Sequence, residues 1–155
     1  MSLINGASAL ADAQLAITVA AKRELAIRVQ QLDYLPENTA FTDALLQLVK
    51  RYPQSRIRIL YSELGLALEN GHGIIGLRRR LPSSIFLRQC DERDANDSRQ
   101  WWLGDRFALL LQADASRPQA NLDTFAKAAG PQYLDLFEDA WQRSREDVRL
   151  REIFL

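Results

Sequence analysis

The order of patterns along the sequence predicts an α/β domain of three layers (α/β/α) with a mixed β-sheet. Between residues 24 and 88, strand-like and helix-like segments alternate, as in parallel strands joined by crossover helices. Residues 98–112 then resemble a β-hairpin, which adds antiparallel strands and makes the sheet mixed. Apolar residues make up 47% of the chain and charged residues 26%, a composition typical of a globular domain.

The first 22 residues are expected to form an N-terminal helix or linker, ahead of a domain that spans residues 23–155. Residues 7–22 contain no Gly or Pro, and Leu10, Ala13 and Ile17 fall near helical spacing. This apolar face is shallow. The helix therefore either leads into the domain or packs against a neighbour outside this sequence.

A strand and a helix are predicted next. Residues 24–30 alternate between apolar and polar or small side chains, which is the period of a β-strand. Residues 41–52 carry apolar side chains at helical spacing. Asn38 or Thr39 can cap this helix at its start, and Pro53 ends it.

The same sequence of patterns is then repeated. Residues 56–61 show the strand alternation, and residues 84–88 show it again. Between them, residues 74–81 have apolar side chains at helical spacing and predict a helix. This helix is expected to end before Pro82, because the residue that precedes a proline avoids helical geometry.

A polar stretch, residues 91–98, predicts a surface loop before the hairpin. The hairpin has a short aromatic strand, a tight turn at Gly104-Asp105 and a continuous apolar strand. Trp101 and Trp102 are neighbours on the first strand, so they face opposite sides of the sheet. Either helices cover both rings, or one ring is exposed as a stacking surface or interface.

The C-terminal third is predicted to be helical. Residues 113–120 predict a loop, and apolar residues at helical spacing then predict a helix over residues 122–129. Gly130-Pro131 is expected to break it. A further helix is predicted over residues 133–141.

This order of elements resembles one half of a phospholipase D-like domain. In that family, a strand–helix–strand–helix–strand core precedes a hairpin with the motif His-x-Lys-x-x-x-x-Asp. The family's His is the nucleophile of phosphodiester transfer, its Lys binds phosphate, and its Asp lies at the hairpin turn. A downstream Asn helps to hold the phosphate. Two such motifs, from two halves or two subunits, form one active site.

Alignment of Asp105 with the family's Asp places Ser98 at the His position and Gln100 at the Lys position. Asn121 is a candidate remnant of the downstream Asn, although its offset is long. An unactivated Ser hydroxyl is a poor nucleophile and needs a base. His72 is the only histidine, and no third group at a recognisable spacing completes a Ser98–His72 pair. The resemblance therefore implies a degenerate motif with no catalytic residue.

The resemblance covers roughly residues 24–142. It extends to a small group of bacterial domains that stand alone or are attached to N-acetyltransferase domains, with no established activity. It implies an accessory domain for which an acetyltransferase domain, outside this sequence, would be a partner. The 155 residues contain no acetyl-CoA-binding signature, and no cofactor is expected.

A basic cluster is a second candidate site. Its candidate anion-binding residues are His72, Arg78, Arg79, Arg80, Arg56 and Arg58. His72 lies between two glycines at the predicted start of a helix, where backbone N–H groups can bind an anion. The alternative is that the three consecutive arginines point in different directions around the helix, complement its dipole and remain solvated.

No metal or redox site is predicted. Cys90, at a strand end, is expected to be a small buried residue, since no His or Lys lies near it in sequence. Asp91, Glu92 and Asp94 form an acidic cluster without a His or Cys, and a solvated loop is the better interpretation. A single cysteine allows no intrachain disulfide, and a cytoplasmic location fits best.

Charge and hydropathy exclude two classes of partner. Twenty basic and 20 acidic side chains give a formal net charge of zero. This balance argues against non-specific nucleic-acid binding, which depends on a clustered positive field. No apolar run approaches the roughly 20 residues of a membrane span, so no membrane partner is expected.

The favoured hypothesis is a non-catalytic accessory or interaction domain, with an anionic ligand or an attached acetyltransferase as candidate partners. The residues at the motif's His and Lys positions, Ser98 and Gln100, motivate it. One alternative is a divergent phosphodiesterase or nuclease that uses other residues. Another is a dimeric scaffold, a homodimer whose interface includes an exposed Trp and the hairpin.

Overall fold

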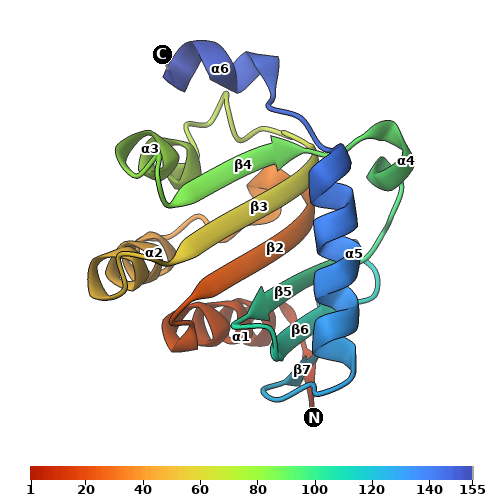
Figure 1. The fold of residues 1–155 in the computed structure, drawn as a ribbon. Coiled ribbons are helices and arrows are strands. Elements are labelled where there is room, and N and C mark those ends of the chain that lie inside the picture. Colours follow the sequence, from red (N-terminus) through yellow and green to blue (C-terminus); the bar gives the residue numbers. More distant parts are fainter. Residues whose placement is uncertain (155) are drawn as a thin grey trace.

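The computed structural model describes residues 1–154, apart from the side chains of Glu152 and Phe154. The described strands are β1 (Ser2–Asn5), β2 (Glu24–Gln31), β3 (Arg56–Glu63), β4 (Ile85–Gln89), β5 (Gln100–Gly104), β6 (Ala108–Gln112) and β7 (Gln119–Asp123). They form a seven-stranded sheet with the order β1-β7-β6-β5-β2-β3-β4 (Figure 1). Strands β2, β3 and β4 are parallel, whereas every other neighbouring pair is antiparallel.

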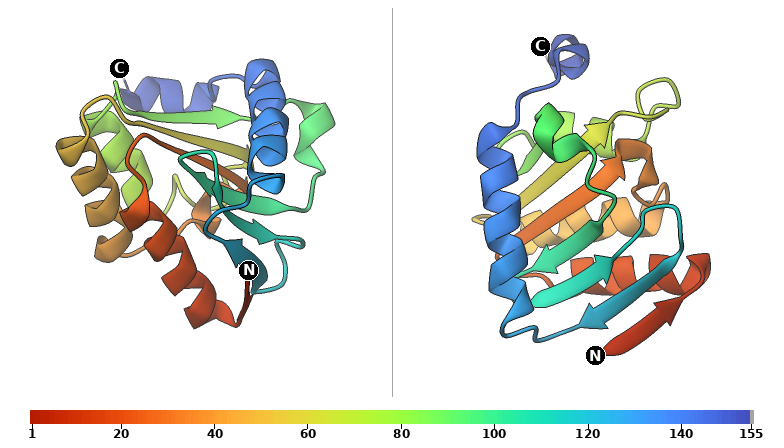
Figure 2. Two further views of the ribbon diagram at one scale, coloured as in Figure 1. Left: turned by 60° about the horizontal axis from the view of Figure 1, so that its bottom comes forward. Right: turned by 90° about the vertical axis from the view of Figure 1, so that its right-hand side faces the viewer.

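Helices cover both faces of this mixed sheet. They are α1 (Ala7–Ala20), α2 (Thr39–Arg51), α3 (Gly73–Arg80), α4 (Glu92–Ala95), α5 (Ala129–Arg143) and α6 (Val148–Phe154), with a 3₁₀ turn, η1 (Leu32–Tyr34). Figure 2 shows α1, α2 and α3 on one side of the sheet and α5 on the other. The predicted three-layer α/β/α class is therefore confirmed. None of the described helices combines the length and hydropathy needed to cross a membrane.

The predicted core of alternating elements is present. Strands β2, β3 and β4 and helices α2 and α3 lie where the sequence patterns place them. The Asn38 side chain accepts a hydrogen bond from the Phe41 N–H and caps α2, as the sequence predicts. Helix α3 ends at Arg80, before Pro82. The polar segment at residues 91–98 includes the short helix α4, because Asp91 caps the Arg93 N–H.

The N-terminal residues join this sheet and its core. Helix α1 packs on the sheet, with Ala13 and Ile17 buried in the same cluster as the apolar residues of β2 and β3. Residues 2–5, for which no strand is predicted, form β1 and pair with β7. Here α1 packs against the domain's own sheet, and not against an external neighbour.

The prediction for residues 113–131 is wrong in two respects. Gln119–Asp123 is the strand β7, not the end of a loop and the start of a helix, because β1 and β6 supply hydrogen-bonding partners on both sides. Gly130-Pro131 does not break a helix but lies in the first turn of α5. A proline is tolerated there, since its missing N–H would have no partner within the helix. Gly130 packs so closely on the Arg106 carbonyl that a Cβ would clash with it.

Candidate functional site

The predicted hairpin is formed by β5 and β6, with β5 also paired to β2. Its tight turn follows Gly104, and Asp105 and Arg106 both have positive φ angles, of 48° and 73°. Asp is one of the few residues other than Gly that adopts this geometry readily. The hairpin thus lies in the interior of the sheet, where the resemblance to phospholipase D-like domains places a motif.

Asp105 holds the hairpin turn against the segment that joins α1 to β2. Its carboxylate accepts hydrogen bonds from the backbone N–H groups of Lys22, Arg23 and Glu24, at 2.9, 2.7 and 3.0 Å. In return, the Asp105 N–H donates to the Glu24 carbonyl at 3.0 Å. Asp105, the predicted counterpart of the motif's Asp, therefore has a structural role.

Gln100 is 5% exposed and is held by the side chains and backbone around it. Its Oε1 accepts from the Gln30 N–H at 2.9 Å, and its Nε2 donates to Gln112 Oε1 at 2.9 Å. The Gln112 amide in turn donates to the Arg117 carbonyl at 2.7 Å. Ser98 is exposed, just before β5. Gln100, which the sequence alignment predicts to stand at the motif's Lys position, is therefore an uncharged, hydrogen-bonded amide.

Asn121 does not lie with Gln100. It pairs with Leu111 on β6, which pairs with Trp101 on β5. Residues paired across strands share a face of the sheet, so Asn121 shares the face of Trp101, whereas Gln100 lies on the opposite face. The structure therefore does not bring these two predicted motif residues together.

His72 caps a helix from a buried position. It is 3% exposed, and its Nδ1 accepts from the Ile74 N–H at 3.1 Å. Its Nε2 lies 3.1 Å from the Leu35 carbonyl oxygen, a contact that requires the N–H at Nε2. Both ring nitrogens are thus occupied. His72 and Ser98 are joined by no hydrogen bond between described residues.

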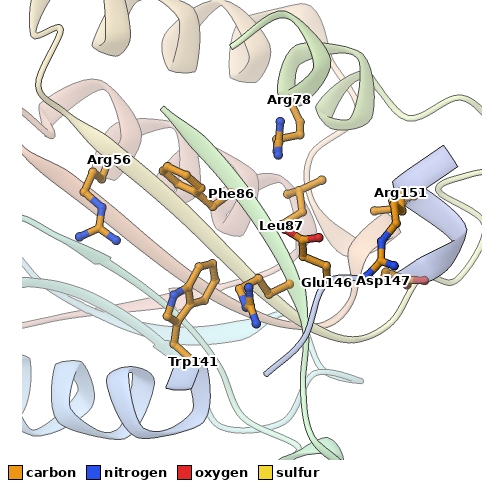
Figure 3. A pocket seen from close by; sticks show the side chains of 10 residues that line it. Arg56, Arg78, Phe86, Leu87, Trp141, Glu146, Asp147 and Arg151 are labelled. Atoms are coloured by element: carbon orange, nitrogen blue, oxygen red, sulfur yellow. The ribbon is translucent and has the colours of Figure 1, made fainter. Parts of the chain in front are cut away.

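A cleft with arginine and aromatic side chains lies on the other face of the sheet, near the β4 edge (Figure 3). We call it the arginine cleft. Six of its lining residues are Arg56, Arg78, Arg88, Arg151, Phe86 and Trp141. Its volume is about 350 Å³. The lining also includes Glu146 and Asp147, so the four guanidinium groups outnumber the two carboxylates.

The arginines of this cleft are positioned in different ways. Arg88 donates from Nε to the Ser144 hydroxyl and from Nη2 to the Ser144 carbonyl, both at 2.7 Å. Its guanidinium lies 5.7 Å from the centre of the Trp141 ring. Arg56 is exposed, lies 5.9 Å from the centre of the Phe86 ring and forms no ion pair with a described residue. The cleft thus combines one fixed and one accessible cation with aromatic walls.

One of the two carboxylates that line the cleft, that of Asp147, is already paired within the fold. Asp147 is 4% exposed and accepts from Tyr61 Oη at 3.0 Å and from Arg149 at 2.8 Å. These contacts leave Glu146, which is exposed, as the second carboxylate of the lining. An anion that entered the cleft would therefore meet a net positive field.

The structure brings together only part of the predicted anion-binding cluster. Arg56 and Arg78 both line the cleft. Arg58 instead forms a bidentate ion pair with Glu138 of α5, and the hydrogen bonds from Arg58 lower the pKa of that carboxyl group. Arg79 and Arg80 are exposed outside the lining.

Sequence reasoning missed most of the lining of the cleft, including Arg88, Arg151, Phe86 and Trp141. Phe86 and Arg88 lie at alternate positions of the short strand β4, which was a usable signal that they share a face. No local pattern links them to Arg151 or Trp141, which come from α6 and α5.

The remaining candidate residues are structural. Trp101 and Trp102 are both buried, at 3% and 2% exposure, and pack against Tyr133 and Phe41 on opposite faces of the sheet. Cys90 is buried, and burial raises the pKa of its thiol, which disfavours the nucleophilic thiolate. Among the residues described, no group of three or more His, Cys, Asp or Glu side chains is arranged to hold a metal ion.

A family model matches residues 6–153, and its description is "Domain of unknown function (DUF7931)". The chain belongs to this family. Comparison of the sequence with curated proteins gave no match.

Two solved structures share the fold. NucT from Helicobacter pylori is 12% identical with a TM-score of 0.64, over 94% of this chain and 98% of that chain. TrmBL2, an archaeal chromatin protein with a described mode of DNA binding, is 12% identical with a TM-score of 0.69. That match covers 94% of this chain and 54% of TrmBL2, so the chain spans about half of that protein. At this identity the likeness shows the fold alone.

Proposed function

We propose that this chain is a non-catalytic ligand-binding or interaction domain with a degenerate phospholipase D-like fold. The observation that supports the proposal is the state of Gln100, which stands at the motif's Lys position and is engaged in hydrogen bonds with Gln30 and Gln112. Ser98 has no base beside it, because the His72 ring nitrogens are used within the fold. A nucleophile without an activating base is weak.

The ligand in this proposal is an anion bound in the arginine cleft. Guanidinium groups bind phosphate and carboxylate through several parallel hydrogen bonds. Arg88 is held in place by Ser144 before any ligand arrives, so little side-chain entropy is lost on binding. The formal net charge of zero argues that the positive field is local to the cleft, which favours a small anion over extended non-specific contact with nucleic acid.

The proposal includes a cytoplasmic location, as the single cysteine favours, and association with an acetyltransferase domain as an accessory unit. The resemblance to bacterial domains of that kind is its support. The alternative of a dimeric scaffold loses the exposed tryptophan on which it was based, since both Trp101 and Trp102 are buried.

The absence of catalysis is tested with a chromogenic phosphodiester and with single-stranded DNA, using NucT as the positive control. We expect no turnover above background for the wild type, Ser98→Ala and His72→Asn. Asn is the replacement at position 72 because it is also a good N-cap. Turnover by the wild type that is lost in either variant would contradict the proposal.

Anion binding is tested by calorimetric titration with inorganic phosphate and pyrophosphate. We expect the double variant Arg56→Ala/Arg151→Ala to bind at least tenfold more weakly than the wild type. Arg79→Ala/Arg80→Ala is the matched control, because it removes the same charge from exposed positions outside the cleft. If both double variants weaken binding equally, the effect is one of net charge, and the cleft is not the site.

A further inference from the structure

A second pocket lies on the face of the sheet opposite the arginine cleft, between α1, η1 and the ends of β5 and β6. We call it the amide pocket. Its volume is about 360 Å³. The lining residues that matter here are Gln14, Gln100, Gln112, Tyr34, Pro36 and Pro118. Among the described residues of its lining, the Tyr34 phenol is the sole ionisable group.

The three glutamines of this pocket come from different elements and are all buried. Gln14, Gln100 and Gln112 are 8%, 5% and 5% exposed. The Gln100–Gln112 pair is fixed by its hydrogen bonds, and one Nε2 hydrogen of Gln100 remains available after its bond to Gln112. The wall of the pocket that Gln100 and Gln112 form is therefore held in place and uncharged, and the second Nε2 hydrogen of Gln100 is available as a donor.

Gln14 is the unusual member. It lies on the buried face of α1 with Ala13, Ile17 and Thr18, and its side-chain amide forms no hydrogen bond with a described residue. The Gln14 amide atoms are not among the buried side-chain atoms that lack a partner, so they reach the open space of the pocket that Gln14 lines. The donor and the acceptor of this amide are therefore both available to a ligand in the pocket.

We propose that the amide pocket binds an uncharged nucleobase. A glutamine side chain presents a C=O and an NH₂ side by side, and this pair forms two parallel hydrogen bonds with a base edge that carries adjacent donor and acceptor groups. The aromatic ring of Tyr34 and the apolar rings of Pro36 and Pro118 provide apolar contact for a planar heterocycle. The lack of charge excludes a site built for phosphate. This inference does not depend on the arginine cleft.

The base could come from a free nucleoside or from a single strand, and the experiment includes both. The wild-type protein, labelled with ¹⁵N, is titrated with adenosine, guanosine, cytidine and uridine at up to millimolar concentration, and separately with a short single-stranded oligonucleotide. We expect the side-chain NH₂ signals of Gln14 and Gln100 to shift with at least one nucleoside or with the strand. Nucleoside binding should be insensitive to salt, since no charge is neutralised.

Gln14→Leu is the decisive variant. We expect it to bind at least tenfold more weakly, while its melting temperature stays within about 2 °C of the wild-type value or rises, because the Gln14 amide forms no hydrogen bond with a described residue. A raised or unchanged melting temperature shows that the variant is folded. Gln142→Leu, which changes an exposed residue of α5, is the matched control and should bind as the wild type does.

Two results would overturn the inference. The first is that neither the nucleosides nor the strand shifts the Gln14 and Gln100 signals of the wild type. The second is that Gln14→Leu binds as tightly as the wild type. A shift caused by the strand and by no nucleoside would support the inference and identify nucleic acid as the source of the base.

Discussion

Asp105 shows how one side chain can both form a turn and attach it to a neighbouring segment. Its carboxylate accepts three backbone N–H groups from the segment before β2. Those N–H groups belong to consecutive residues that enter an interior strand of the sheet, where each backbone donor needs a partner. The same carboxylate also stands in a turn with positive φ, so one side chain determines both the turn and its attachment.

We predict that Asp105→Ala lowers the free energy of unfolding by about 2–3 kcal/mol, because hydrogen bonds to a charged acceptor are lost and the turn geometry disfavours Ala. Asp105→Asn should cost less, since Asn keeps one acceptor oxygen and adopts positive φ readily. Urea denaturation measures both values. Asp43→Ala, at an exposed position of α2, is the control and should stay within about 0.5 kcal/mol of the wild type. Equal stability of Asp105→Ala and the wild type would contradict the structural role.

Helix α5 is attached to its face of the sheet by an ion pair as well as by apolar contacts. Phe137 is fully buried, and Arg58 of β3 lies over the Phe137 and Trp141 rings, 5.1 and 5.5 Å from their centres. Arg58 is 4% exposed, so its charge depends on the carboxylate of Glu138 for compensation. The helix therefore brings to β3 the counter-charge that its buried arginine requires.

The Arg58–Glu138 pair makes part of the stability dependent on pH. The folded-state pKa of Glu138 is lowered by its hydrogen bonds with Arg58. A lowered pKa contributes stability above the unfolded value of about 4.3, and this contribution is lost as the pH falls through the folded value. We predict that Glu138→Gln costs about 1 kcal/mol at neutral pH, a modest value because the Glu138 side chain is 39% exposed.

Urea denaturation of the wild type and Glu138→Gln across acidic and neutral pH measures this effect. The difference in unfolding free energy should shrink as the pH falls below the unfolded-state value of about 4.3 and through the lower folded-state pKa of Glu138, where the wild-type carboxyl group becomes protonated. Asp139→Asn, at the exposed neighbouring position, is the control. A difference that stays constant with pH would show that the pair does not titrate as described.

The N-terminal segment is part of the same folded unit as the rest of the chain. Helix α1 contacts α2, β5, β6 and β7, and β1 extends the sheet beyond β7. Ile17 is 4% exposed and lies against Gly104 at the hairpin turn. Removal of this packing should therefore lower the free energy of unfolding of the whole domain, and should not cause α1 to unfold by itself.

We predict that Ile17→Ala lowers the free energy of unfolding by about 2–4 kcal/mol, the usual cost of a large-to-small change in a core. Val19→Ala, two residues away in the same helix and 66% exposed in the wild type, should cost less than about 0.5 kcal/mol. Thermal and urea denaturation, followed by both Trp fluorescence and circular dichroism, should show one cooperative transition. A separate early transition in Ile17→Ala would indicate that α1 unfolds independently.

The sequence was sufficient to predict those helices and strands whose pattern of apolar residues lies within one short stretch of the chain. The alternation in β2 and the helical spacing in α2 are visible within single windows of the chain, and the class of fold follows from their order. Strands β1 and β7 carry weak patterns. Strand β1 exists because it pairs with β7 across more than 100 residues of sequence, and β7 is held between β1 and β6. Long-range partners of this kind leave no mark on local periodicity.

The candidate sites also divide into those that the sequence could predict and those that only the tertiary structure shows. The hairpin, its turn and the residues at the motif positions were predicted from spacing along the chain, because a hairpin is a local structure. The arginine cleft joins Arg56 to Arg151, and the amide pocket joins Gln14 to Gln100 and Gln112. Tertiary packing alone determines which side chains share a pocket and which, like Arg58, are used within the fold. The physical reason is that a site depends on contacts between surfaces, whereas a sequence pattern records only which face of its own element each side chain occupies.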